Sequence, residues 1–199
     1  MQVVLDYVCT GRVRKRLIEG RLLSSAIGKV PVTGAVPVGP LGLEGDEQED
    51  LSVHGGLSKA LYAWPVQHTA WWNAQRTERL GHTALFDNPI PPGGVGENLG
   101  LRGLEQPLCE TEVYVGDELH FAHAVLRVTE ARQPCFKFNA VLGYEHASKD
   151  MVLSGRCGFY LSVVQAGVLG AGDTATLVPG PRSLSIAQAL QGKRYKHLR

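Results

Sequence analysis

Apolar and polar residues alternate along several short stretches of this chain, and this spacing is typical of β-strands with one buried face. The stretches that fit it are residues 25–32, 113–115, 118–129, 160–164 and 174–178. Turn-forming pairs of glycine with aspartate or proline separate them, as at Gly116-Asp117. The pattern therefore predicts many short strands joined by tight turns.

One stretch instead has the 3.6-residue spacing of a helix. Residues 59–79 contain apolar and amide side chains at helical intervals, namely Trp64, Gln67, His68, Trp71, Trp72 and Gln75. Pro65 stands where a first helical turn tolerates proline, and Gly81 predicts the end of the helix. A second, short helix is predicted at 185–191. Few helices with many strands predict a mostly β fold with added helices (α+β), arranged as a β-barrel.

Composition limits the classes of function. Hydrophobic residues make up 44% of the 199 residues, which is enough for a sizeable core, and 24 glycines and 11 prolines favour turns. The formal net charge of +1 argues against nucleic acid or an anionic membrane as the main partner. The apolar stretch at 3–8 is short and interrupted by Asp6, unlike a signal peptide or a membrane span. We therefore expect a cytoplasmic protein with reduced cysteines.

Cys135 is the first candidate for chemistry. It ends the sequence Arg132-Gln133-Pro134-Cys135, which follows the predicted strand at 118–129. Pro134 stiffens the backbone, and positive charge from Arg132 and Lys137 favours a thiolate. Such a thiolate suits a soft or high-valent transition metal or serves as a nucleophile. The alternative is a small buried core residue, which is the usual environment of a free cysteine.

Two glycine-containing segments are weaker candidates. His54-Gly55-Gly56 precedes the predicted helix, so its backbone N–H groups and Lys59 predict an anion site, or alternatively a plain turn capped by Ser58. The glycines at 93–96 do not fit the dinucleotide-binding spacing. They lead into Glu97 and Asn98, which can recognise amide-like ring edges or belong to a surface loop.

Other familiar sites are not supported. The acidic segment 42–50 lacks the spacing of a calcium loop and is interpreted as a solvated turn. His120 and His123 are predicted to face opposite sides of a strand, so they do not form a zinc pair. No Gly-x-Ser-x-Gly sequence supports a serine hydrolase.

Taken in order, the motifs resemble a known family. The sequences concerned are Gly-Leu-Glu-Gly-Asp-Glu-Gln (42–48), Val-His-Gly-Gly (53–56), Lys-Ala-Leu-Tyr-Ala-Trp-Pro (59–65), Gly-Glu-Asn-Leu (96–99), Val-Tyr-Val-Gly-Asp (113–117), Arg-Gln-Pro-Cys (132–135) and Ser-Gly-Arg-Cys-Gly-Phe-Tyr (154–160). Together they resemble the MOSC domain (molybdenum cofactor sulfurase C-terminal), in particular its stand-alone bacterial branch that reduces N-hydroxylated compounds. The resemblance runs from about Gly11 to about Pro181 and implies a twisted β-barrel.

The resemblance also implies a cofactor and its contacts. The cofactor is a molybdenum held by a pyranopterin dithiolene, with Cys135 as the protein's metal ligand. Pyridoxal phosphate binding is a further expectation at the level of the family. Cofactor contacts are implied for His54, Gly55, Lys59, Asn98 and Arg132, and Ser25 with Lys29 is expected to hold the cofactor's phosphate.

The implied activity is the reduction of hydroxylamines, including N-hydroxylated base analogues, to amines. Glu97 or His54 is expected to pass the proton. The chain has no cysteine pattern for iron–sulfur clusters and no flavin motif, so a separate electron-donor reductase is expected. The alternatives are a non-catalytic carrier of the molybdenum cofactor, a persulfide-sulfur carrier that uses Cys135, and a general small-molecule-binding β-domain.

The end of the chain departs from the branch it resembles. Residues 1–182 are expected to form the barrel domain, and 183–199 a short helical and basic tail where relatives have a longer helical segment. A homodimer is compatible with the resemblance, but the segment that would build its contacts is short here. Cys157 stands where another residue type is expected, which places a second thiol near the site.

Overall fold

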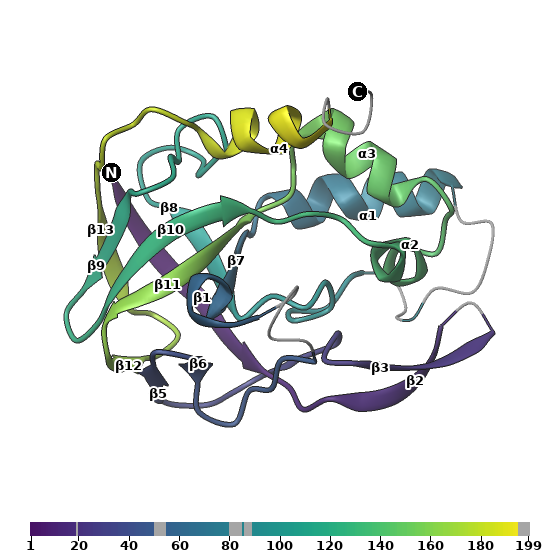
Figure 1. Ribbon diagram of the computed structural model, residues 1–199, viewed down its shortest axis with the longest axis horizontal. Helices are drawn as coiled ribbons and strands as arrows, with labels where there is room; N and C mark the ends of the chain where they lie inside the picture. The colour runs from purple at the N-terminus through teal and green to yellow at the C-terminus, as the bar shows by residue number, and fades with distance from the viewer. Residues whose placement is uncertain (19, 50–54, 80–84, 86–88, 195–199) are drawn as a thin grey trace.

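The computed structural model describes residues 1–18, 20–49, 55–79, 85 and 89–194 (Figure 1). Seven strands close into a barrel. In order around it they are β13 (Thr174–Val178), β9 (Glu118–Phe121), β10 (Val125–Ala131), β11 (Phe159–Gln165), β7 (Leu61–Pro65), β8 (Leu99–Gly103) and β1 (Gln2–Thr10). Pairing of β1 with β13 completes the closure. The predicted mostly β barrel is therefore confirmed.

Two smaller sheets stand beside the barrel. One consists of β12 (Gly167–Leu169), β5 (Val36–Gly39) and β6 (Gly42–Leu43), while β4 (Val30–Pro31) pairs with the end of β1. The other is a hairpin of β2 (Arg14–Ile18) and β3 (Arg21–Ser25), which pairs with no further described strand. This β2–β3 arm extends along one side of the molecule, away from the barrel strands (Figure 1).

The helices cover one side of the barrel (Figure 1). They are the 3₁₀ turn η1 (Leu57–Lys59) and the α-helices α1 (His68–Arg79), α2 (Phe136–Leu142), α3 (Ala147–Ser154) and α4 (Ile186–Arg194). The sequence pattern predicted α1 and α4 but missed α2 and α3, which lie between β10 and β11. None of the described helices is long and apolar enough to cross a membrane.

The helix predicted at 59–79 begins later than expected. Residues 61–65 form strand β7, and every one of them is buried. Burial of consecutive residues means that both faces of the strand are covered, so no alternation appears in the sequence. Pro65 consequently ends a strand instead of starting a helix. The predicted helix end at Gly81 lies outside the described residues.

Two predicted strands are divided by turns. Residues 118–129 form a hairpin, in which the Phe121 N–H donates to the Ala124 carbonyl at 2.9 Å between β9 and β10. Residues 25–32 turn at Gly28, where φ is +77°. The segment 113–115 contributes only one isolated bridge, between Tyr114 and Ser185. An alternating pattern persists across a short turn, and therefore the sequence did not reveal these breaks.

The described part of the tail predicted for 183–199, which ends at residue 194, packs against the barrel. Ile186 and Leu190 of α4 are buried in the same hydrophobic core as the strands. Trp72 of α1 packs edge-on against Phe138 of α2, with ring centroids 5.0 Å apart. Helix α4 thus shares the core of the barrel strands, and the division at 182/183 stays a prediction.

A buried contact between His68 and Glu110 joins α1 to the segment between β8 and β9. His68 Nε2 lies 2.9 Å from both carboxylate oxygens of Glu110. Glu110 also accepts the backbone N–H groups of Cys157 and Gly158, at 3.0 and 2.8 Å. Burial raises the pKa of Glu110, but its bonds to His68 and to the backbone outweigh burial and leave this pKa below its ordinary value. The fold therefore stabilises the Glu110 carboxylate in its charged form.

Glu110→Gln is expected to lower the free energy of unfolding by about 1–3 kcal/mol, because a buried donor loses its charged acceptor. Since the pKa of Glu110 is lowered on folding, its contribution should be present above the ordinary value of 4.5 and be lost as pH falls below it. Urea unfolding at a series of pH values measures both effects. Glu112→Gln, at an exposed position, is the control. Equal stability of the two variants would contradict the prediction.

Candidate functional site

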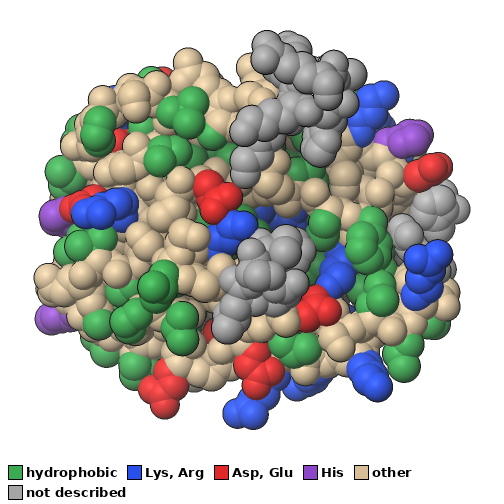
Figure 2. All heavy atoms as spheres, in the orientation of Figure 1, with side chains coloured by type: hydrophobic (Ala, Val, Ile, Leu, Met, Phe, Trp, Pro, Cys, Tyr) green, Lys and Arg blue, Asp and Glu red, His purple; other side chains and the backbone are tan. Residues whose placement is uncertain are grey.

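A cavity of about 640 Å³, counted to its open mouth, lies between the base of the β2–β3 arm, the acidic segment 46–49 and the start of α2. Figure 2 shows basic side chains inside a hollow near the middle of one face. The lining residues that matter below are Ser25, Lys29, Asp46, Glu49, Lys59, Tyr62, Asn98, Arg132, Cys135, Lys137 and Tyr160.

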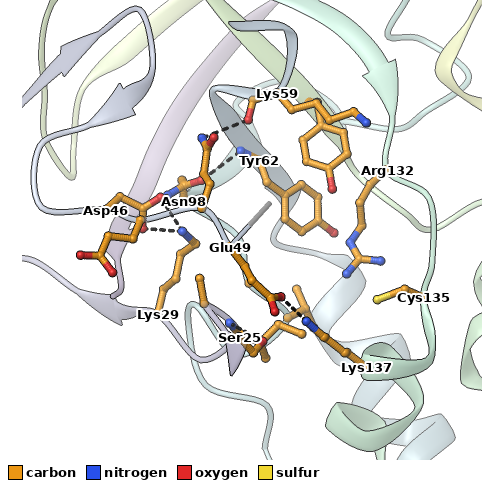
Figure 3. A pocket seen from close by; sticks show the side chains of 17 residues that line it. Ser25, Lys29, Asp46, Glu49, Lys59, Tyr62, Asn98, Arg132, Cys135 and Lys137 are labelled. Carbon is orange, nitrogen blue, oxygen red and sulfur yellow. Dashed lines mark hydrogen bonds and ion pairs between the residues drawn. The ribbon is translucent and has the colours of Figure 1, made fainter. Parts of the chain in front are cut away.

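Cys135 stands at the start of α2, not at the end of the strand. Its backbone is extended, with φ −131° and ψ 168°, and it is the residue that caps α2. Its carbonyl accepts the Phe138 N–H at 2.9 Å and the Ser148 hydroxyl at 2.9 Å, which fixes the corner from both α2 and α3. The thiol is partly exposed, and Figure 3 shows the sulfur directed toward the cavity.

Arg132 is buried beside Cys135. Its guanidinium carbon lies 5.3 Å from the ring centroid of Tyr62 and 5.4 Å from that of Phe138. Nη1 donates to the Gln133 carbonyl at 3.0 Å, but the buried Nε has no hydrogen-bond partner among the described residues. Burial lowers the pKa of Arg132, yet nearby Tyr62, Tyr160 and Cys135 outweigh burial and raise it. The site therefore holds a charged guanidinium with unused hydrogen-bonding capacity, facing the cavity (Figure 3).

Lys29 and Asn98 belong to one network on the opposite wall. The Lys29 ammonium is paired with the Asp46 carboxylate, and both side chains are buried. Burial lowers the pKa of Lys29, and the Asp46 charge opposes this effect. Asn98 Nδ2 donates to Asp46 at 2.9 Å, and Asn98 Oδ1 accepts the Tyr62 N–H at 3.1 Å. Asn98 thus connects the acidic segment to strand β7.

Two further lysines line the cavity near its mouth. Lys137 donates to the Ser24 carbonyl at 3.0 Å and is paired with Glu49, so α2 is tied to the arm and to the acidic segment. Lys59 Nζ lies 3.7 Å from Glu130 and 5.7 Å from the ring centroid of Tyr160. Each of these lysines therefore has a carboxylate partner.

The structure brings together most, but not all, of the residues that the sequence singled out. Ser25, Lys29, Lys59, Asn98, Arg132 and Cys135 line one cavity. Gly55 and Glu97 are not among its lining residues. Gly55 packs so closely on Gln48 that an added Cβ would lie 2.1 Å from Oε1. His54 lies outside the described residues.

The segment after Gly56 differs from its prediction. Only the three-residue 3₁₀ turn η1 follows it, and the chain then enters strand β7. Gly56, not Ser58, occupies the cap position, and its N–H donates to Gln48 Oε1 at 2.9 Å. A long helix is therefore not available here to bind an anion at its N-terminus.

Sequence reasoning missed several lining residues. Tyr62 and Tyr160 lie opposite each other on the paired strands β7 and β11, with ring centroids 5.5 Å apart. The acidic segment, interpreted as a solvated turn, supplies the Asp46 and Glu49 carboxylates. The signal available for Lys137 was its position two residues after Cys135. Cys157 is fully buried and its thiol donates to the Gly158 carbonyl, so it is not a lining residue.

Among the described residues, no group of three His, Cys, Asp or Glu side chains converges in a way that could hold a metal ion. Within this part of the chain, Cys135 is the cysteine that lines the cavity. The described part of the site therefore offers a metal one soft ligand.

Comparison with known proteins identifies the family. Residues 50–176 match the family described as the MOSC domain. Protein YiiM of Escherichia coli (strain K12) is 33% identical over 182 residues, covering 92% of this chain and 75% of that protein. A protein named Reductase from Gibberella moniliformis is 32% identical over 180 residues, covering 89% of this chain and 30% of that protein. The crystal structure of YiiM from Geobacillus stearothermophilus superposes with a TM-score of 0.73 at 28% identity, covering 99% of this chain and 86% of that one. The chain belongs to the MOSC domain family.

The loop beside the cavity, residues 93–96, is held by hydrogen bonds to a titratable carboxylate, that of Glu97. Its buried carboxylate accepts the N–H groups of Gly93 and Val95 at 2.7 and 3.1 Å, and the Tyr7 hydroxyl at 3.0 Å. Val95 and Gly96 of this loop line the cavity. Burial raises the pKa of Glu97 from 4.5 to about 7, against the lowering effect of these hydrogen bonds.

The wild-type protein should therefore lose stability as pH rises from 4.5 through 7, because over this interval the folded state holds a proton that the unfolded state has released. Glu97→Gln should flatten this part of the profile. Urea unfolding above and below pH 7 measures the slope, and Glu44→Gln, at an exposed position, is the control. An unchanged slope in the Glu97 variant would show that the prediction is wrong.

Proposed function

We propose that this protein is a molybdenum-cofactor-dependent oxidoreductase that reduces N-hydroxylated compounds to amines. The observation that carries the proposal is the convergence of the Cys135 thiol and the Arg132 guanidinium on one cavity. Family membership supports the cofactor, and the relative named Reductase supports a redox role. The proposed substrates are hydroxylamines, including N-hydroxylated base analogues.

The residues present fit an anionic, metal-bearing pterin. The buried Nε of Arg132 has no partner among the described residues, so an anion there would satisfy it. Cys135 supplies a soft sulfur ligand at the same cavity. A dithiolene brings further sulfur ligands with the metal, which agrees with the absence of a multi-residue metal cluster among the described residues. We assign the cofactor's phosphate to the end of the cavity near Ser25 and Lys29.

The overall reaction consumes two electrons and two protons. The N–O bond breaks, the nitrogen gains a hydrogen, and the oxygen leaves as water: R₂N–OH + 2 e⁻ + 2 H⁺ → R₂NH + H₂O. The bound cofactor supplies the two-electron redox chemistry. The electrons come from a separate reduced flavin or iron–sulfur protein, because the chain contains no motif for either group.

The chain's own side chains bind and orient the cofactor and neutralise its charge. Arg132 and Lys59 offset the cofactor's negative charge, and the rings of Tyr62 and Phe138 hold the Arg132 guanidinium in place. Asn98 fixes the wall that carries Tyr62. Glu97 was one of two proposed proton-passing residues, but it does not line the cavity. It accepts hydrogen bonds from the 93–96 loop, so we assign it a positioning role. His54 remains the proposed proton donor.

A sulfur carrier is the second candidate, and the partly exposed Cys135 thiol favours it. A persulfide needs an accessible cysteine but neither molybdenum nor a pterin. Elemental analysis for molybdenum, together with pterin fluorescence after acid release, separates the two functions. Near-stoichiometric molybdenum supports the oxidoreductase, whereas protein that is free of metal and pterin and carries a persulfide supports the carrier.

Cys135→Ser is expected to lower the reduction of an N-hydroxylated purine, driven by a reduced dye, by at least about 100-fold, since even outer-shell changes at metal sites cost 10–100-fold. Cys109→Ser, which alters a partly exposed thiol that is not among the lining residues, should keep full activity. Full activity in the Cys135 variant would overturn the proposed ligand.

Arg132→Lys should reduce retention of molybdenum and pterin by about tenfold or more, because an ammonium cannot reproduce the planar set of guanidinium donors. The measurement is the molybdenum and pterin content per chain after gel filtration. Arg127→Lys, at an exposed position of β10, is the matched control. Unchanged content in the Arg132 variant would show that this arginine does not hold the cofactor.

A further inference from the structure

The β2–β3 arm carries a concentrated positive charge. Residues 12–21 include five basic residues and one acidic residue, Glu19. None of the five forms an ion pair with a residue that the structure describes. By contrast, the exposed Arg102 and Arg127 on the barrel each have a carboxylate partner. Because the whole chain has a net charge of only +1, this charge is a local feature of the arm.

The outer face of the arm has an apolar centre. Leu17 and Leu22 lie directly opposite each other on the two strands and are 68% and 65% exposed. Ile18, on the other face, is buried. Lys15 and Ser24 form the next pair on the same face as the leucines. Arg21 pairs with Ile18 and lies on the opposite face, so the leucine face itself carries one cation, Lys15. Apolar side chains near charged ones are common at protein–protein interfaces.

The composition of the arm also distinguishes among anionic partners. Single-stranded nucleic acids are bound by aromatic side chains on which bases stack, and residues 12–25 contain none. Two leucines on the two-stranded arm are a small apolar area for anchoring a protein to a membrane. An acidic protein surface with an apolar spot matches both the leucine pair and the exposed cations of the arm.

The arm adjoins the mouth of the cavity. Ser25, the last residue of β3, lines the cavity, and Lys137 of α2 donates to the Ser24 carbonyl at 3.0 Å. Phe136, between Cys135 and Lys137, is 48% exposed. Figure 3 shows Ser25, Lys137 and Cys135 around the same opening. A protein bound to the arm would therefore lie next to Cys135.

We infer that the β2–β3 arm is the docking surface for an acidic electron-transfer protein, which delivers the two electrons that each N–O cleavage consumes. The partner's identity as an electron donor rests on the proposed function. The docking itself rests on the charge and exposure of the arm. Electrostatic attraction would speed the encounter, and the leucine pair would supply the apolar contact.

Direct binding tests the inference without relying on activity. The full chain is immobilised, and three probes are applied at low and at physiological ionic strength: flavodoxin and plant-type ferredoxin, which are acidic, and cytochrome c, which is basic. We expect the acidic probes to bind, more weakly as salt is added, and cytochrome c not to bind. Combining Lys15→Glu with Arg21→Glu, which reverses one cation on each face of the arm, should weaken binding by about tenfold or more. Leu17→Ser should weaken it without changing the salt dependence.

The control combines Arg102→Glu with Lys149→Glu, which makes the same change in net charge at exposed positions away from the arm. It should change binding by less than about twofold if the arm is the docking surface. Equal losses in both variants, or no binding of either acidic probe, would overturn the inference. Arm-dependent binding of anionic vesicles or an oligonucleotide in place of the proteins would also overturn it.

A second assay separates this inference from the proposed function. Both double variants should reduce an N-hydroxylated purine at the wild-type rate when a small reduced dye is the donor, since Lys15 and Arg21 do not line the cavity. Normal dye-driven activity without binding of either acidic probe would contradict the docking role of the arm. It would leave the proposed reductase activity supported. If the wild-type protein shows no dye-driven activity, the proposed enzymatic function is wrong.

Discussion

The candidate site depends on one physical constraint, which is that a charged guanidinium is buried without a complete set of partners. Arg132 is only 6% exposed, and two aromatic rings and one backbone carbonyl make up most of its described environment. Leaving a buried donor without an acceptor costs about 1–3 kcal/mol. This buried charge is the physical basis of the proposed anionic ligand.

The barrel positions this arginine from several directions. Strand β10 ends at Ala131, so Arg132 begins the crossover that carries α2 and α3. The parallel pair β7 and β8 places Tyr62 beside Asn98, whose N–H donates to the Tyr62 carbonyl at 2.8 Å. The buried Glu110 binds the backbone of Cys157 and Gly158, and the Gly158 carbonyl in turn accepts the Arg132 N–H at 3.3 Å. The wall of the cavity is thus continuous with the hydrogen bonds of the core.

Charge is distributed differently in the cavity and on the arm. Lys29, Lys59 and Lys137 all have carboxylate partners, so they shape the cavity without leaving a strong excess of positive charge in it. Arg132 is the exception among the described cations of the lining. The arm instead presents cations at the surface, where an approaching partner can reach them. A chain that is nearly neutral can therefore recognise a bound anion at one place and an acidic protein at another.

The sequence by itself determined the mostly β fold and helices α1 and α4, and it singled out Arg132 and Cys135, which both line the cavity. These depend on local periodicity, on a stiff proline and on an ordered set of motifs, all of which can be seen along the chain. It did not reveal that 61–65 is a strand, because a strand covered on both faces loses its alternation. Only the tertiary structure placed Asp46, Glu49 and Tyr160 in the cavity and moved Glu97 behind it. Those positions depend on contacts between residues distant in sequence, and no local pattern encodes them.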